Sequence, residues 1–425
     1  MPSTLAPAAR VAALERLLEV ARRLGATVDL DQLLATIVSA AIDLLDCERA
    51  TVFLYDAKAD ELWSRIATGS DGSLISEIRF AASRGIAGEV ARTGQLVNIL
   101  DAYADPRFNP EVDRASGYRT RSILAARLAD HDDATVGVLQ LLNKRSGHFT
   151  PSDEEIAGFL GGQAGVAIQR QQLLTHYAEK QRIERDLNIA RGIQQGLLPR
   201  EQPVLAGWDI AGWNRPADET GGDFFDFCPL DDGSLAVIIA DATGHGIGPA
   251  LVMAEARALF RAVLHERKEL ARAVTAVHRL LCLDMPDGRF VTAFCGVAST
   301  AGGFEYLSAG QGPILWYEAA TGSVQELPTQ GLPLAFFPDA VYAGEVRMEL
   351  APGDVLALLT DGFYEWDRPD GEAFGTERVA DALRHRRDLP ARELIEALTY
   401  EVTTFAAGNP QRDDLTAVIV KRVNT

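Results

Sequence analysis

The segment GGDFFDFCPLDDGSLAVIIADATGHG, residues 221–246, decides the fold of the second half of the chain. Apolar residues lie on both sides of an Asp-Asp-Gly turn at 231–233, which predicts an antiparallel β-hairpin over residues 225–241. Asp223 and Asp241 stand directly beside these apolar runs. A carboxylate held against a buried strand lies in a low-dielectric position, where an unpaired charge is costly.

Two later stretches repeat this pattern of an acid beside an apolar run. LALLTDGFYE (356–365) contains Asp361, and RDDLTAVIV (412–420) contains Asp413. One such aspartate alone usually caps a turn or faces solvent. Four of them indicate a site for divalent cations, because Mg²⁺ and Mn²⁺ prefer carboxylate, carbonyl and water oxygens.

Two such ions about 3.5–4 Å apart can share a water, lower its pKa and direct the resulting hydroxide at a phosphorus atom. Hydrolysis of this kind needs no protein nucleophile. The sequence agrees, since it contains no CxxxxxR loop, no Gly-x-Ser-x-Gly elbow and no GxxxxGK[ST] phosphate loop.

Residues 202–423 resemble the metal-dependent protein phosphatases of the PPM type (the 2C class), and within them the SpoIIE and sigma-factor-regulator branch. The four acidic stretches match that family in order and spacing, as do RFVTAFCGV (289–297), LAPGDVLALLTDG (350–362) and DGEAFGTERV (370–379). The resemblance implies an α+β fold, an αββα sandwich with two stacked antiparallel sheets, flanking helices and metals at one end.

The resemblance also implies which residues form the metal and catalytic site. They are Asp223, Asp241, Asp361 and Asp413, together with the backbone carbonyl of Ala242. Asp241 is expected to bridge two divalent cations, Mn²⁺ or Mg²⁺.

Four further residues around these motifs carry separate expectations. Asp414 is expected to orient the ligands, and Asp226 to support the loop. His245 fits either a general acid or a structural hydrogen bond of the Gly-His-Gly turn. Gln311 stands where relatives commonly have histidine and cannot titrate near neutrality, which affects loop contacts and substrate preference before it affects activity.

Residues 30–172 have an α+β pattern with a helix over 30–50 and strands over 50–56, 61–68, 122–130 and 135–144. The motifs Gly85 to Gly88, VGVLQLLNK (136–144) and PSDEEIAGFLGGQAGVAIQ (151–169) resemble a GAF domain, a sensory module of cyclic-nucleotide phosphodiesterases and bacterial regulators. Asn143-Lys144, Phe149 and Asp153-Glu154 match the pattern of its cyclic-nucleotide-binding members. The same residues also fit a structural Lys144–Asp153 ion pair, so the small-molecule ligand stays open.

Two helical segments flank this domain. Residues 1–29 form an N-terminal helix that either packs on its own domain or mediates dimerisation. Residues 173–201 form a linker whose apolar residues fall near heptad positions, interrupted by Lys180 and Gln194; it is a short coiled coil or a solvated helix, and a homodimer is expected. Its end, IARGIQQGLLP (189–199), resembles the segment before the catalytic domain of SpoIIE-type phosphatases. The phosphatase domain then spans residues 202–425.

The bulk composition excludes several classes of partner. A net charge of −19 and a pI of about 4.8 oppose binding to nucleic acid or to an anionic membrane. The four cysteines form no CxxC pair, which indicates a reducing cytoplasm rather than a zinc site or a disulfide framework. No signal peptide or membrane span is expected.

The function expected is that of a metal-dependent protein serine/threonine phosphatase regulated by the GAF-like domain. Its substrate would be a phosphoserine or phosphothreonine on a regulatory protein such as an anti-sigma-factor antagonist, as the family branch implies. The alternative is a catalytically inert scaffold that binds a phosphoprotein or a cyclic nucleotide. A cyclic-nucleotide phosphodiesterase is disfavoured, because its histidine-rich metal motifs are missing and the seven histidines are scattered.

Overall fold

The computed structural model describes residues 7–27, 29–64, 78–265, 269–285 and 288–424. The chain forms two compact units, Met1–Arg182 and Ile183–Thr425, which we describe separately. Parts of two expected elements, residues 1–6 and 28 of the N-terminal helix and 65–68 of the second strand, lie outside the described residues.

The first unit is built on a six-stranded antiparallel sheet with the strand order β3-β2-β1-β6-β5-β4. Its strands are β1 (Cys47–Asp56), β2 (Glu61–Ser64), β3 (Ile78–Ala81), β4 (Val97–Ile99), β5 (Ile123–Ala129) and β6 (Thr135–Lys144). Its helical elements are α1 (Pro7–Ala26), α2 (Leu30–Leu45), α3 (Gly85–Thr93), the 3₁₀ turn η1 (Ala102–Ala104), α4 (Glu111–Ser116) and the first part of α5 (Pro151–Leu197).

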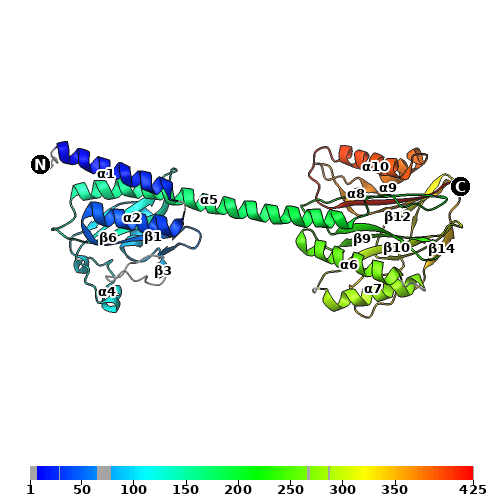
Figure 1. Ribbon diagram of the computed structural model, residues 1–425, viewed down its shortest axis with the longest axis horizontal. Coiled ribbons are helices and arrows are strands. Elements are labelled where there is room, and N and C mark those ends of the chain that lie inside the picture. Colours follow the sequence, from blue (N-terminus) through cyan, green and yellow to red (C-terminus); the bar gives the residue numbers. More distant parts are fainter. Residues whose placement is uncertain (1–6, 28, 65–77, 266–268, 286–287, 425) are drawn as a thin grey trace. The chain divides into compact units, whose positions relative to one another are not determined.

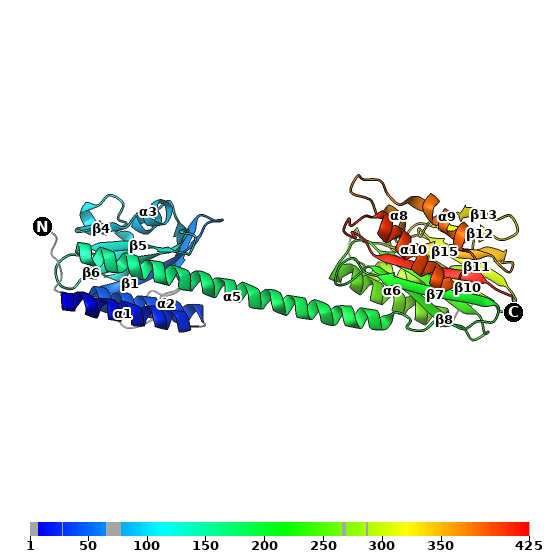
Figure 2. The same cartoon turned by 90° about the horizontal axis from the view of Figure 1, so that it is seen from above.

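Helices cover both faces of this sheet, as Figure 2 shows. On one face α2 and α5 pack against β1, β5 and β6, and α3 packs on the other face. Val20 and Leu24 of α1 join the core with α2. Helix α1 therefore packs on its own domain, the first of its two expected arrangements.

Helix α5 is continuous from Pro151 to Leu197 and contributes residues to both units. No change of secondary structure marks residue 172, where the expected sensor domain ends and the linker begins. Pro199 follows two residues after the helix, as expected for a residue that cannot continue it.

The second unit contains two five-stranded antiparallel sheets, ordered β14-β11-β10-β9-β8 and β13-β12-β15-β16-β7. The strands are β7 (Trp208–Arg215), β8 (Asp223–Pro229), β9 (Leu235–Ala242), β10 (Val291–Ala298), β11 (Gly303–Ala309), β12 (Ile314–Glu318), β13 (Ser323–Leu327), β14 (Val346–Glu349), β15 (Val355–Leu359) and β16 (Leu415–Arg422). The helices are α6 (Ile247–His265), α7 (Leu270–Asp284), α8 (Gly362–Glu365), α9 (Gly375–Arg386) and α10 (Ala391–Phe405).

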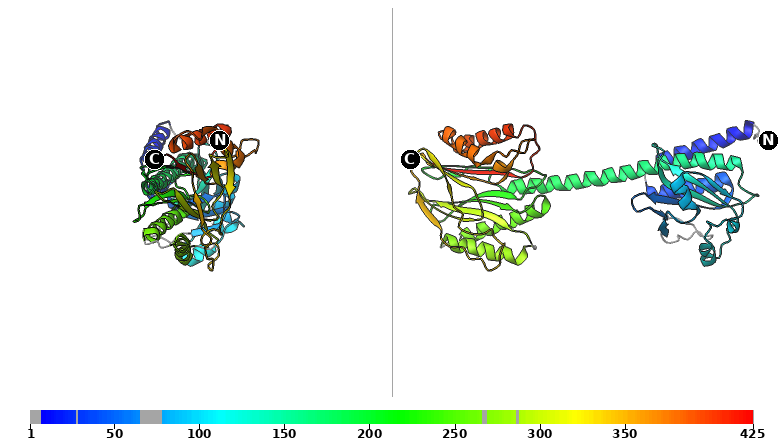
Figure 3. Two further views of the ribbon diagram at one scale, coloured as in Figure 1. Left: turned by 90° about the vertical axis from the view of Figure 1, so that its right-hand side faces the viewer. Right: turned by 180° about the vertical axis from the view of Figure 1, so that it is seen from behind.

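The two sheets stack face to face between two helical layers (Figures 1 and 3). An apolar core that includes Phe225, Phe294 and Tyr306 fills the space between the sheets. Helices α6 and α7 pack on the outer face of the first sheet, and α9 and α10 pack on the outer face of the second. The expected α+β architecture, with a GAF-like unit and an αββα sandwich, is confirmed.

Within the described residues, no helix combines the length and the apolar character needed to cross a membrane. The four cysteines all lie among the described residues, and no disulfide bond joins any two of them.

Candidate metal centre

Asp223 and Asp241 lie opposite each other at one end of the first sheet. Asp223 begins β8, Asp241 stands near the end of β9, and the antiparallel register pairs the two residues directly. Directly paired residues of neighbouring strands have Cβ atoms about 4.5–5.5 Å apart. The hairpin of β8 and β9, whose first strand begins two residues before the predicted one, therefore places two acids side by side.

The second sheet supplies the other two predicted acids. Asp361 follows β15 and is the N-cap residue of α8, and Asp413 stands two residues before β16. Desolvation and then repulsion from Asp361 raise the pKa of both Asp241 and Asp413. The four predicted aspartates, two from each sheet, therefore gather at one end of the sandwich.

Burial and mutual repulsion raise the pKa of these carboxyl groups. Asp223 is 2% exposed, and desolvation followed by repulsion from Asp241 and Asp414 holds its pKa well above its usual range. Desolvation and the charge of Asp361 raise the pKa of Asp241 to about 7. The protein alone thus penalises the ionised form of the site, as expected for carboxylates prepared for a cation.

The residues present fit divalent cations by the chemistry of their donor atoms. The carboxylates at this end of the sandwich lie near the backbone carbonyl of Ala242. The chain at Gly222 approaches that carbonyl so closely that a Cβ at residue 222 would collide with its oxygen. Hard cations take such oxygen ligands. Among the described residues, no group of three or more His, Cys, Asp or Glu side chains is placed so that it could hold a metal ion.

Two threonines and Asp414 fix the position of Asp223. The hydroxyls of Thr360 and Thr416 both donate to Asp223 Oδ2 at 2.6 Å. Asp414 accepts the Asp223 N–H at 3.2 Å and the Ala217 N–H at 2.7 Å. The contacts of Asp414 match its expected orienting role. The sequence patterns did not predict the role of the two threonines, although both stand within three residues of a motif aspartate.

Asp226 is fully buried and bound by two arginines of α6. Arg261 donates to both of its oxygens at 2.6 and 2.8 Å, and Arg257 Nε lies 3.0 Å from Oδ2. The side chain faces the helical layer, which matches the structural role expected for it.

His245 and Gln311 occupy different environments near the acids. The side chain of His245 is 73% exposed, and its Nδ1 lies 2.8 Å from Asp218 Oδ2, so it has a hydrogen-bond partner in a neighbouring loop. Gln311 is buried; it accepts from the Thr292 hydroxyl of β10 at 2.7 Å and donates to the Leu359 carbonyl of β15 at 3.0 Å. Gln311 therefore joins the two sheets, a role that needs no titratable group.

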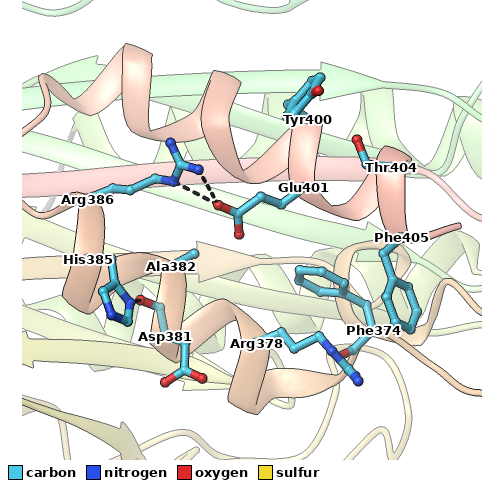
Figure 4. A pocket seen from close by; sticks show the side chains of 10 residues that line it. All are labelled: Phe374, Arg378, Asp381, Ala382, His385, Arg386, Tyr400, Glu401, Thr404 and Phe405. Atoms are coloured by element: carbon cyan, nitrogen blue, oxygen red, sulfur yellow. Dashed lines mark hydrogen bonds and ion pairs between the residues drawn. The ribbon is translucent and has the colours of Figure 1, made fainter.

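A groove of about 710 Å³ lies between α9 and α10, as Figure 4 shows. Its lining includes Phe374, Arg378, His385 and Tyr400, and none of the site aspartates contributes to it. The site aspartates and this groove therefore lie on different parts of the second unit.

In the first unit, Lys144 Nζ lies 2.9 Å from Asp153 Oδ1 and also donates to the Leu45 carbonyl at 2.8 Å. The structural ion pair, one of the two expected roles for these residues, is confirmed. The pair ties the end of β6 to the start of α5 beneath α2.

Comparison with known proteins finds a matching family for part of each unit. Residues 231–423 match the family described as Stage II sporulation protein E (SpoIIE), and residues 29–168 match the GAF domain. The SiaA-PP2C domain of Pseudomonas aeruginosa is 26% identical with a TM-score of 0.51, covering 58% of this chain and 99% of that domain. The RsbU and RsbW domains of Rv1364c from Mycobacterium tuberculosis are 27% identical with a TM-score of 0.45, covering 52% and 61%.

A curated relative is the "Probable 3',5'-cyclic phosphodiesterase pde-5" of Caenorhabditis elegans, 36% identical over 186 residues, which is 41% of this chain. The match spans 25% of the length of that relative.

The second unit is therefore a PP2C-like domain, of the class of metal-dependent protein phosphatases. Within that class it belongs to the SpoIIE branch, and the chain combines this domain with an N-terminal GAF domain.

Proposed function

We propose that this chain hydrolyses phosphoserine or phosphothreonine on a regulatory protein and that its GAF domain controls the rate. One observation carries the proposal: two carboxylates from each sheet lie at one end of the sandwich, where desolvation and then repulsion from Asp361 raise the pKa of Asp241 and Asp413. Membership of the SpoIIE branch supports a protein substrate. An anti-sigma-factor antagonist is the substrate that we propose from that branch.

Asp223, Asp241, Asp361, Asp413 and the Ala242 carbonyl would hold the cations in this proposal. Two bound Mn²⁺ or Mg²⁺ ions would lower the pKa of a shared water and neutralise phosphate oxygens. The chain's own contribution is orientation, because a ligand whose rotamer is fixed by hydrogen bonds loses less freedom on binding. Asp223, held by two hydroxyls, is the most firmly oriented of these ligands.

The test is the release of phosphate from a phosphoserine peptide by the full chain with Mn²⁺. Asp241→Ala is expected to lower kcat/KM by at least about 100-fold, because it removes a charged metal ligand. Asp231→Ala, in the exposed turn of the same hairpin, is the matched control and is expected to keep the parent rate. Equal rates for the parent and Asp241→Ala would refute the assignment.

The same assay separates the competing functions. A scaffold would bind the phosphopeptide without releasing phosphate. A phosphodiesterase would instead cleave 3',5'-cyclic nucleotides, the substrate class in the name of the curated relative.

Control by the GAF domain requires a ligand that binds the active and inactive states with different affinity. Cyclic AMP and cyclic GMP are the first probes. A true regulator is expected to shift both the unfolding temperature and the phosphatase rate. A shift in temperature without a change in rate would argue against control by that ligand.

A homodimer is the assembly that we propose, formed through α5. Leu173 and Tyr177 are large apolar side chains four residues apart on this charged helix, and they are 60% and 64% exposed. Such residues are typical of coiled-coil seams. Sedimentation velocity of the full chain should give twice the mass of 45.9 kDa, and Leu173→Glu with Tyr177→Glu should yield the monomer.

A further inference from the structure

Gln194 is a buried polar residue on a stretch of helix that is otherwise largely exposed. Only 7% of its surface is accessible, whereas the neighbouring Ile189 and Ile193 are 57% and 65% exposed. The helix thus turns an amide toward its own unit and apolar residues toward solvent. A buried amide is stabilising only where its donor and acceptor both find partners.

Both partners come from one residue, Gly221. Gln194 Nε2 donates to the Gly221 carbonyl oxygen at 2.5 Å, and the Gly221 N–H donates to Gln194 Oε1 at 3.1 Å. One side chain therefore binds both the backbone N–H and the backbone carbonyl of a residue 27 positions away.

Gly221 leads directly to the acids of the metal centre. It lies two residues before Asp223, and a Cβ at Gly221 would collide with the carboxylate of Asp414. Asp414 in turn accepts the N–H of Asp223 at 3.2 Å. The segment 221–223 is therefore enclosed between the amide of Gln194 and the carboxylate of Asp414, so its position depends on both.

We propose that Gln194 is a positioning residue that couples the end of α5 to the Asp223 side of the metal centre. This inference rests on the proposed function and names the contact through which the helix would act. It also assigns a role to a polar residue that interrupts the heptad pattern: its amide holds the site segment of its own unit instead of facing another helix.

The geometry makes this contact sensitive to helix rotation. With side chains an α-helix is about 10–12 Å across, so the Gln194 amide lies about 5–6 Å from the axis. A rotation of about 20° moves such a group by about 2 Å, which exceeds the tolerance of a hydrogen bond. A small rotation of α5 would then release Gly221 and loosen the backbone that carries Asp223.

The test measures Mn²⁺ binding to the full chain by titration calorimetry, without substrate, and then hydrolysis of para-nitrophenyl phosphate against Mn²⁺ concentration. Gln194→Met keeps the length of the side chain and removes both hydrogen bonds. Gln194→Glu keeps the acceptor for the Gly221 N–H and removes the donor to its carbonyl. Gln195→Met, at the adjacent exposed glutamine, is the matched control.

Gln194→Met is expected to raise the Kd for Mn²⁺ about tenfold, with kcat at saturating Mn²⁺ within about twofold of the parent. Gln195→Met should bind as the parent does. If Gln194→Met does not fold, as judged by circular dichroism, Gln194→Glu decides, since it too should weaken Mn²⁺ binding.

Three results would overturn the inference: parental Mn²⁺ affinity in both Gln194 variants, equal weakening by Gln195→Met, or a lower kcat at saturating Mn²⁺ with unchanged affinity. If the parent binds Mn²⁺ but hydrolyses no phosphomonoester, the proposed function fails while the binding comparison still decides the role of Gln194. A parent that binds no Mn²⁺ would refute both.

Discussion

Replacing Asp241 with asparagine is expected to stabilise the metal-free protein at pH 8. Folding raises the pKa of Asp241 from 3.8 to about 7, so between these pH values the carboxyl group is protonated in the folded state and ionised in the unfolded chain. The stability linked to this group is complete below about pH 4 and is lost as the pH rises toward 7. This direction is opposite to that of a salt-bridged aspartate.

The shift of about 3 units corresponds to about 4 kcal/mol in total, of which about 2–3 kcal/mol falls between pH 5 and pH 8. Because neighbouring acids share the repulsion, we expect the parent in EDTA to lose about 2 kcal/mol of unfolding free energy over that range. The asparagine variant should lose much less. Asp231→Asn, in the exposed turn, should behave as the parent does.

Urea unfolding followed by tryptophan fluorescence measures this change, because four of the five tryptophans lie in the second unit and only Trp63 lies in the first. Added Mn²⁺ should stabilise the parent more at pH 8 than at pH 5.5, since metal must displace protons at the lower pH. A parent whose stability is constant or rises from pH 5 to 8, or an asparagine variant with the same slope, would refute the reasoning.

Three further substitutions test the supports of the site. Thr416→Val removes one of the two hydroxyls that bind Asp223 and should raise the Kd for Mn²⁺ about tenfold in calorimetry; an unchanged affinity would contradict its role. Gln311→Ala removes the two hydrogen bonds by which its buried amide joins the sheets, which should cost about 2–4 kcal/mol in urea unfolding, and a loss below about 1 kcal/mol would contradict the proposed link between the sheets. Asp226→Ala leaves Arg261 beside an empty site and should cost about 3–5 kcal/mol, seen as a lower unfolding temperature of the second unit alone; an unchanged temperature would show that the buried ion pair contributes little.

Local sequence patterns predicted the hairpin over residues 225–241, although its first strand, β8, begins two residues earlier at Asp223. Alternating and apolar runs identified β8 and β9, and an acid at a strand end stays at that end once the strand is paired. Once the turn is placed at residues 231–233, the antiparallel register sets Asp223 opposite Asp241. The grouping of Asp361 and Asp413 with them came from the family resemblance, because no local pattern relates one sheet to the other.

Contacts between distant segments could not be predicted in the same way. The sequence suggested that Gln194 interrupts a coiled-coil seam, whereas its amide binds Gly221, and that pairing depends on where α5 meets β8. Gln311 likewise stood out only as a departure from a family motif. Its amide in fact joins Thr292 on β10, 19 residues away, to Leu359 on β15, 48 residues away. Polar residues that bridge such segments have no periodicity by which to recognise them.

The position of β16 affects when the second unit can complete its fold during synthesis. This strand lies between β15 and β7, although it follows every other strand in the sequence. A growing polypeptide would therefore keep a gap in its second sheet, and lack Asp413, until residues 413–422 have been synthesised. On the proposed assignment of Asp413 as a metal ligand, cation binding would then follow completion of the domain.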